Sequence, residues 1–198
     1  MRQDLSRHLV GSTVTERDFV ARAQGGDHDA FTVLARASVA RLDAAARLIL
    51  RDRELARDAV QEALIRAWRD LPGLRDPDRF DAWLYRLLVH ACIDEARRRR
   101  RRPMEVELTV LHVPSVPDST RSMVLRDELD RALATIQPEH RALVVLHYYL
   151  GVPLPEAAGA LGISLGAAKS RLHRAIGSLR RSFGVEPGEA AFEGGRPA

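Results

Sequence analysis

The sequence predicts an all-α protein built from two small helical domains that a flexible linker joins. Aromatic residues make up only 5% of the 198 residues, whereas strands are enriched in aromatic and β-branched side chains. Apolar residues recur at helical intervals over most of the chain. Between residues 103 and 122 that periodicity fails and three prolines occur, which indicates a linker between two sets of helices.

The first set of helices is expected over residues 16–102, after a polar segment, 1–15, that is expected to be disordered. A first helix over 16–23 ends at a Gly-Gly pair, and Asp27 is placed to cap a second helix over 30–50. A third helix over 54–71 ends at Pro72, because Pro-Gly interrupts a helix. Asp78 is expected to cap a fourth helix, which starts at Phe80 and continues into six arginines.

The second set is expected over residues 123–183. Its first helix covers 123–136, and Pro138 suits the first turn of the next helix, which ends at Gly151. A short helix begins at residue 154 or 155 and ends before Gly162, and Ser164 then caps a longer helix that reaches about residue 181. The tail, 184–198, is rich in Gly, Pro and Glu and is expected to be disordered.

Positive charge is concentrated in two places along the chain. Arg97 to Arg102 contribute six charges without a break, and residues 164–181 hold five basic residues and no acidic one. Because the whole chain has a net charge of only +4, the rest of it is net acidic. Two separate phosphate-binding surfaces explain this distribution better than general solubility does.

The single cysteine, Cys92, excludes an intramolecular disulfide and a thiolate metal cage. The N-terminal residues contain no apolar run that would suit a signal peptide, and no segment has the roughly 18–20 apolar residues that a membrane span needs. We therefore expect a cytoplasmic protein without membrane insertion.

The segment 154–174 has the layout of a helix-turn-helix. Ala157 and Ala158 are small enough to let a second helix cross closely, and Gly162 adopts a left-handed turn at little cost. The alternative is an amphipathic hairpin with a solvated basic face, but the lack of acidic residues favours DNA. The residues expected to meet the major groove and its phosphates are Ser164, Lys169, Ser170, Arg171, His173 and Arg174.

Four strings, in this order, resemble the sigma-70 family of RNA polymerase sigma factors. DAVQEALIRAW (58–68) and FDAWLYRLLVHACIDEAR (80–97) are similar to region 2, and QPEHRAL (137–143) and LGAAKSRLHRA (165–175) are similar to region 4. The resemblance covers about residues 16–182 without the linker. The resemblance includes no counterpart of regions 1 and 3, which we expect to be absent, as in the extracytoplasmic-function (ECF) subfamily. It implies that region 2 lies within 16–102 and region 4 within 123–183.

The resemblance also implies functions for residues of region 2. An acidic face with apolar neighbours would bind the coiled coil of the polymerase largest subunit, through Asp58, Gln61, Glu62, Leu64 and Trp68. The next helix would melt the −10 element and capture one strand, since aromatic rings stack on bases while cations follow the backbone. Its candidates are Tyr85, Arg86, His90, Asp94, Arg97, Arg98 and Arg99.

Some positions depart from the family pattern. His90 stands where asparagine is expected, and Ala167 and Ala168 replace the usual Thr-Val. Trp83 has helical spacing from Phe80 and Leu87, which favours a place in the core over a base contact.

Three functions remain to be compared. The first is an ECF sigma factor that binds core RNA polymerase and promoter DNA, reads the −35 element as duplex, and is held inactive by an anti-sigma factor. The second is a stand-alone helix-turn-helix regulator with an N-terminal dimerisation or sensing domain. An enzyme ranks last, because the sequence has no phosphate-binding Gly loop, nucleophile elbow or metal-ligand cluster. We expect no catalytic residues, metal, cofactor or small-molecule substrate.

Overall fold

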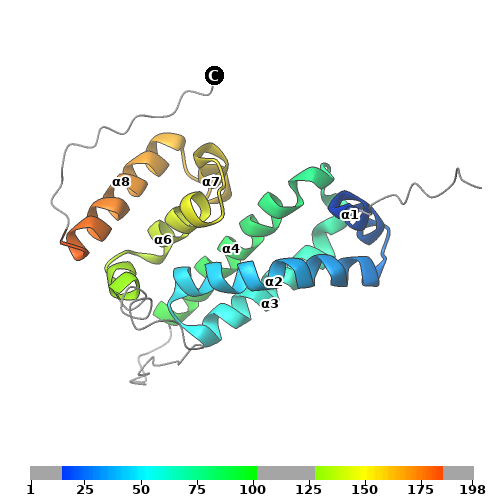
Figure 1. Cartoon of the computed structure of the whole chain (residues 1–198), viewed down its shortest axis with the longest axis horizontal. Coiled ribbons are helices and arrows are strands. Elements are labelled where there is room, and N and C mark those ends of the chain that lie inside the picture. The colour runs from blue at the N-terminus through cyan, green and yellow to red at the C-terminus, as the bar shows by residue number, and fades with distance from the viewer. Residues whose placement is uncertain (1–14, 102–127, 185–198) are drawn as a thin grey trace, which may run out of the picture.

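The computed structural model describes residues 15–101 and 128–184, and every regular element in these two ranges is a helix (Figure 1). The all-α fold in two sets of helices, as predicted from the sequence, is therefore confirmed. The expected linker, 103–122, lies outside the described residues, as do all but one residue of each expected terminal segment, 1–15 and 184–198.

The first set is a helical bundle in which neighbouring helices are joined by short turns. Side chains cap three of the helices: Thr15 forms a capping box with Asp18, Asp27 accepts the Ala30 N–H, and Asp52 accepts the N–H groups of the first turn that it precedes. The helices are α1 (Glu16–Gln24), α2 (His28–Leu50), α3 (Arg53–Asp70) and α4 (Phe80–Arg101).

Two short 3₁₀ turns, η1 (Leu71–Gly73) and η2 (Pro77–Arg79), connect α3 to α4. The expectation that Asp78 caps α4 is wrong. Asp78 lies inside η2, and it is the Asp76 side chain that accepts the Asp78 N–H, so a 3₁₀ turn leads directly into α4. The Asp76 carboxylate therefore caps the 3₁₀ turn that precedes α4.

The second set contains helical residues 128–134, α6 (Pro138–Val144), α7 (Leu154–Ala160) and α8 (Leu165–Ser182). The helix that begins at Pro138 is not α-helical to its end, because η3 (Val145–Tyr149) has π-helical hydrogen bonding. Gly151 and Gly162 have φ values of +70° and +64°, which place them in the left-handed region that favours glycine. Gly162 makes the turn between α7 and α8.

One hydrophobic cluster extends through both sets of helices. In the first set its most buried side chains include Leu42, Ile49 and Leu88, and in the second set they include Leu143 and Leu172. Helix α6 contacts α2 and α4, and α7 contacts α4, so the second set packs along one side of the bundle (Figure 1). No helix in the described ranges is long and apolar enough to cross a membrane.

Candidate nucleic-acid interface

Helix α8 presents the basic surface that the sequence predicts after Gly162. Ala168, Leu172 and Ala175 are buried and fix the helix to α6 and α7. Ser164 caps its first turn, where the hydroxyl accepts the Ala167 N–H at 3.2 Å. The exposed side of the first turns carries Lys169, Ser170, His173 and Arg174. These side chains and the free amides of the capped end can together meet bases and phosphates.

Arg171 lies at the edge of this basic surface and is half-buried. It is close enough to α6 to affect His140, whose pKa is lowered by burial first and then by the positive charges of Arg171 and Arg174. The neutral form of His140 is therefore favoured beside the two guanidinium groups. Arg174 is more exposed, and its Nε donates to the Ser170 carbonyl.

The expected −10 residues of α4 do not all lie on one free surface. Arg86, His90 and Arg97 are exposed, but Tyr85 is only 4% exposed. The Tyr85 hydroxyl accepts a hydrogen bond from Arg41 at 2.6 Å and donates to Asp81 at 3.3 Å, and burial raises the Tyr85 pKa. In this conformation the Tyr85 ring therefore offers no free face for stacking on a base.

The arginines at the end of α4 fall into two groups. Arg98 pairs with Glu95 at 3.1 Å, and Arg99 pairs with Asp52 at the start of α3, also at 3.1 Å. The other three, Arg97, Arg100 and Arg101, are exposed and form no ion pair with any residue in 15–101 or 128–184. They are the positive charges most available to an external phosphate.

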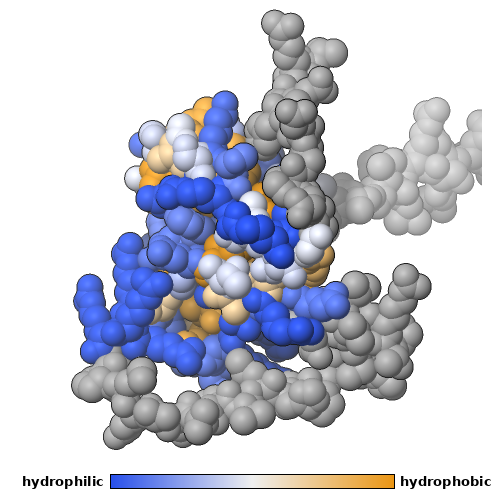
Figure 2. Space-filling view, turned by 90° about the vertical axis from the view of Figure 1, so that its left-hand side faces the viewer, coloured by the Kyte–Doolittle hydropathy of each residue, from blue (hydrophilic) through white to orange (hydrophobic). Residues whose placement is uncertain are grey.

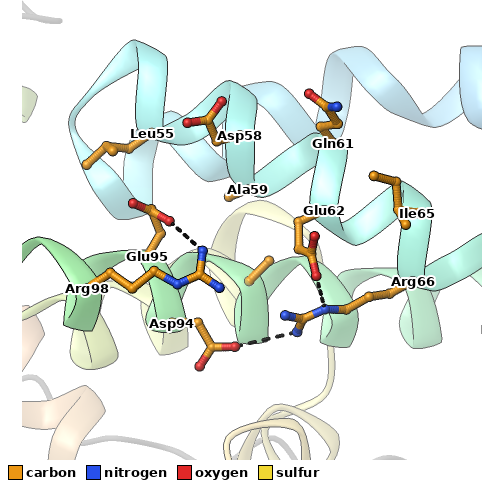
Figure 3. Close-up of a pocket in the computed structure, with 11 residues that line it drawn as sticks. Leu55, Asp58, Ala59, Gln61, Glu62, Ile65, Arg66, Asp94, Glu95 and Arg98 are labelled. Carbon is orange, nitrogen blue, oxygen red and sulfur yellow. Dashed lines mark hydrogen bonds and ion pairs between the residues drawn. The ribbon is translucent and has the colours of Figure 1, made fainter.

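A groove of about 360 Å³ lies between α3 and α4 (Figure 3). Arg66 spans it, with its Nε 2.7 Å from Glu62 and its Nη1 3.5 Å from Asp94. One guanidinium group thus connects a residue expected to bind polymerase with a residue expected to read DNA. The lining also includes Asp58 and Gln61, which are exposed.

Two of the expected polymerase-binding side chains, Leu64 and Trp68, are half-buried against other parts of the bundle. Leu64 packs against the core, and the Trp68 ring lies 4.3 Å from the ring centroid of His28 and 5.1 Å from that of Phe31. Trp83 also packs on the core beside Phe80, as its spacing predicts.

Ile65 was not among the predicted site residues, although it is 53% exposed and lines the groove. Ile65 lies off the apolar stripe of its helix, one turn after Gln61 and Glu62, and an apolar residue on this polar side of the helix is the signal in the sequence.

The two sets of helices also touch through polar side chains. His90 Nε2 lies 2.6 Å from the Ala160 carbonyl oxygen, and Arg79 pairs with Glu156 at 2.8 Å. Beyond His90, a hollow of about 340 Å³ is lined by residues of α3 and α4 and by Leu161 and Gly162 of the helix-turn-helix.

Hydrophilic side chains cover much of the end of the molecule seen in Figure 2, with apolar patches between them.

Within the described ranges no group of three His, Cys, Asp or Glu side chains could hold a metal ion. Cys92 is buried, and no other cysteine is present in the chain.

Two family models match the chain, and both describe parts of bacterial initiation factors. The model described as Sigma-70 region 2 matches residues 34–102, and the one described as Sigma-70, region 4 matches residues 126–179. These ranges contain α3 and α4 with their groove, and the helix-turn-helix.

Curated relatives agree with this assignment. The ECF RNA polymerase sigma factor SigM of Mycobacterium tuberculosis is 33% identical over 170 residues, which is 86% of this chain and 85% of SigM. SigL of the same species is 37% identical over 132 residues, covering 65% of this chain and 75% of SigL. The RNA polymerase sigma-E factor of Streptomyces avermitilis is 35% identical over 138 residues, 70% of this chain and 76% of that factor.

Solved structures have the same fold. CnrH in complex with the cytosolic domain of CnrY aligns with a TM-score of 0.62 and 26% identity, over 86% of this chain and 98% of CnrH. The sigma factor RpoE of Bartonella quintana, solved with the anti-sigma factor NepR, aligns with a TM-score of 0.65 and 24% identity, over 79% of this chain and 98% of RpoE.

A helical fold with a region 2 and a region 4 defines a transcription initiation factor. The chain belongs to the sigma-70 family, and within that family it is an ECF sigma factor.

Proposed function

We propose that this ECF sigma factor binds core RNA polymerase and selects promoters by two separate contacts, one with duplex DNA and one with a separated strand. The single observation that carries this proposal is the exposed basic surface of α8, on a helix that is capped at its N-terminus and fixed from behind by Ala168 and Leu172. The polymerase supplies the catalysis, and this chain acts as a specificity factor and not as an enzyme.

The −35 element is read by the first turns of α8 as duplex. An α-helix fits the major groove, and Lys169, Arg171 and Arg174 can donate to guanine edges or phosphates. Ser170 and His173 lie on the same exposed side, and Ser164 holds the helix end that can bind a phosphate. These residues are close together in sequence and in space, so a single helix can form the whole contact.

The −10 element is melted and held by α4. Arg86, His90 and Arg97 are exposed along this helix, and the two arginines are cations that can follow the backbone of an unpaired strand. Asp94 adds an acceptor, while Arg98 and Arg99 must exchange their carboxylate partners for phosphates. Tyr85 joins the contact only after its hydrogen bonds to Arg41 and Asp81 are broken.

The groove between α3 and α4 binds core polymerase. Its lining carries both signs of charge, with Asp58 and Glu62 on α3 beside Arg66, and Ile65 adds an exposed apolar contact (Figure 3). A helical partner with basic residues around an apolar position would complement such a surface. Trp68 acts indirectly, by fixing α3 on α2, and Leu64 acts by packing against the core.

We further propose that region 2 occupies residues 16–102 and region 4 residues 123–183, and that the factor acts in the cytoplasm. An anti-sigma factor is its expected regulator, because RpoE of Bartonella quintana was solved with one.

The function is tested by reconstitution. Purified chain should co-migrate with core polymerase and start transcription from a cognate promoter, and Asp58→Arg should weaken co-migration by placing a cation where the partner's basic residues bind. Asp29→Arg, an exposed reversal outside the groove, is the matched control. A chain that binds duplex DNA but never core polymerase would instead be a stand-alone helix-turn-helix regulator.

A further inference from the structure

Three arginines from different helices lie close together at one end of the bundle. Arg51 directly follows α2, Arg100 lies near the end of α4, and Arg141 lies on α6. Helices α2 and α4 end at the same end of the bundle (Figure 1), and α6 contacts both of them. We call Arg51, Arg100 and Arg141 the arginine cluster. It gathers positive charge from segments that are far apart in the sequence.

Arg141 is the most buried member of the arginine cluster and is only 6% exposed. Its Nη1 donates to the Leu133 carbonyl at 3.1 Å, whereas its Nε is buried and has no hydrogen-bond partner among the described residues. The pKa of Arg141 is lowered to about 10, first by burial and then by the positive charges of Arg51 and Arg100. Arg141 therefore stays charged at neutral pH, and a buried charge with an unused donor is costly unless an acceptor meets it.

No carboxylate pairs with these charges in the part of the chain that the structure describes. None of the three arginines forms an ion pair with residues 15–101 or 128–184. Glu139 is near enough to raise the pKa of Arg141 but forms no ion pair with it, and the Glu139 Oε2 is itself buried without a partner. Asp52, the neighbour of Arg51, is paired with Arg99. Three cations beside one carboxylate leave two positive charges uncompensated.

The backbone at Arg51 provides independent evidence. Its φ of +56° lies in the left-handed region, and no other residue except glycine has a positive φ in the described ranges. Glycine would adopt this conformation without strain, so an arginine here carries a backbone cost that glycine would avoid. The Arg51 Nε is also buried without a hydrogen-bond partner among those residues. Such an outlier indicates a role for the side chain beyond ending α2.

We propose that the arginine cluster binds the phosphate group of a small anion, either free phosphate or a phosphorylated small molecule. Guanidinium groups present planar sets of N–H donors that match phosphate oxygens, and the resulting charge-assisted hydrogen bonds are short and strong. A phosphate group carries roughly 1.5–2 negative charges at pH 7, which matches two uncompensated cations, whereas a carboxylate would neutralise only one. The site is separate from the proposed function and does not depend on it.

A purely structural role for Arg141 explains less of the geometry. Capping the helix that contains Leu133 would account for the hydrogen bond of Nη1. It would not account for the unused Nε groups of Arg141 and Arg51, nor for the approach of a third cation, Arg100. A bound phosphate would meet arginines of α2, α4 and α6 together and would replace their mutual repulsion by attraction. Phosphate should therefore stabilise the native chain.

Thermal unfolding of the full chain in inorganic phosphate, at an ionic strength held constant with sodium chloride, gives the first test. At about ten times the dissociation constant the Tm should rise by roughly 3–6 °C, and the rise should saturate. Phosphate also stabilises proteins by exclusion from their surface, but that effect grows with concentration and does not saturate. Pyrophosphate in the same titration separates the two sources. Tighter binding than phosphate assigns the site to a phosphorylated small molecule, and equal or weaker binding assigns it to free phosphate.

Variants of the arginine cluster give the second test. Arg51→Gly removes a guanidinium group where glycine suits the left-handed backbone, so the fold should be kept. It should weaken phosphate binding by at least about tenfold, as should Arg100→Gln at its exposed position. Arg36→Gln is the matched control, because Arg36 is an exposed arginine of α2 that lies roughly 22 Å along the helix from Arg51. It should bind phosphate as the wild-type chain does.

Chemical modification of arginines locates the bound anion. Phosphate should slow the reaction of phenylglyoxal with Arg51 and Arg100 several-fold, as measured by mass spectrometry of peptides, and leave the reaction of Arg36 unchanged. A rise in Tm that does not saturate, or that is equal in Arg51→Gly and the wild-type chain, would overturn the proposal. It would also be overturned if single-stranded DNA protected Arg51 and Arg100 while phosphate and pyrophosphate did not, because the cluster would then belong to the nucleic-acid interface.

Discussion

Individual side chains on α8 carry the contact that can be tested most directly. Arg174→Ala should lower promoter affinity by about 1–3 kcal/mol if its guanidinium reads a base. Fluorescence anisotropy with promoter duplex at fixed salt measures this change. Arg180→Ala is the control, since Arg180 is exposed on the same helix but lies about four turns from the capped end. Equal losses at both positions would indicate a general charge effect.

Because Cys92 is buried, we expect the free energy of unfolding to depend on pH. Burial raises the pKa of Cys92 to about 12, above the value of about 8.5 for a free thiol. The folded state therefore favours the protonated thiol, and this contribution is complete below about pH 8.5 and is lost as the pH rises towards 12. At pH 8 a thiol reagent should modify Cys92 only in denaturant, whereas a cysteine at Thr32→Cys should react at once. Rapid reaction of native Cys92 would contradict its burial.

At the scale of the element, the cap of α8 separates helix stability from DNA binding. Ser164→Ala removes the acceptor of the Ala167 N–H and should cost about 1 kcal/mol in the free energy of unfolding. Ser164→Asp keeps a capping oxygen but adds negative charge, so stability should be retained while duplex affinity falls. Thermal unfolding and anisotropy on both variants distinguish the two effects. Unchanged affinity in Ser164→Asp would place this helix end away from any phosphate.

The end of α4 allows a second comparison between matched groups of arginines. Replacing Arg97, Arg100 and Arg101 by Gln should flatten the dependence of log affinity on log salt by roughly 0.7–0.9 for each lost phosphate contact. Arg98 and Arg99 are partly neutralised by Glu95 and Asp52. Gln at these two positions should therefore flatten the salt dependence of the affinity less per residue. A salt titration of DNA binding measures both slopes. Identical changes per residue would show that the ion pairs do not persist on DNA.

At the scale of the whole molecule, the shared hydrophobic cluster predicts cooperative unfolding. The native chain should unfold in one calorimetric transition, because the cluster continues from the bundle into the second set. Leu48 is half-buried between them, and Leu48→Ala should cost about 1–2 kcal/mol, less than the ~2–5 kcal/mol of a fully buried leucine. It should also separate the transition into two. Leu74→Ala, within the first set, should lower stability without separating it.

The sequence was most informative where the spacing of residues along one helix decided which side chains are buried and which are exposed. In α8 the buried Ala168 and Leu172 and the exposed Lys169 and Arg174 alternate with the period of one helix, so its two sides could be assigned without coordinates. Tyr85 and Trp68 were assigned to binding surfaces by resemblance, but Tyr85 is buried and the half-buried Trp68 ring packs on Phe31 of α2. Periodicity identifies the apolar side of a helix, but it does not show which neighbouring helix covers the residues at the edges of that side.

By itself the sequence determined the helical fold class, the order of the elements and the family, because these depend on local periodicity, caps and short strings of residues. Only the tertiary structure decided which charges are paired and which surfaces are covered. Arg66 meets Asp94, Arg99 meets Asp52 and His90 meets Ala160, and each pair comes from different elements. Such contacts depend on how helices cross in space, and no local pattern in the chain records that geometry.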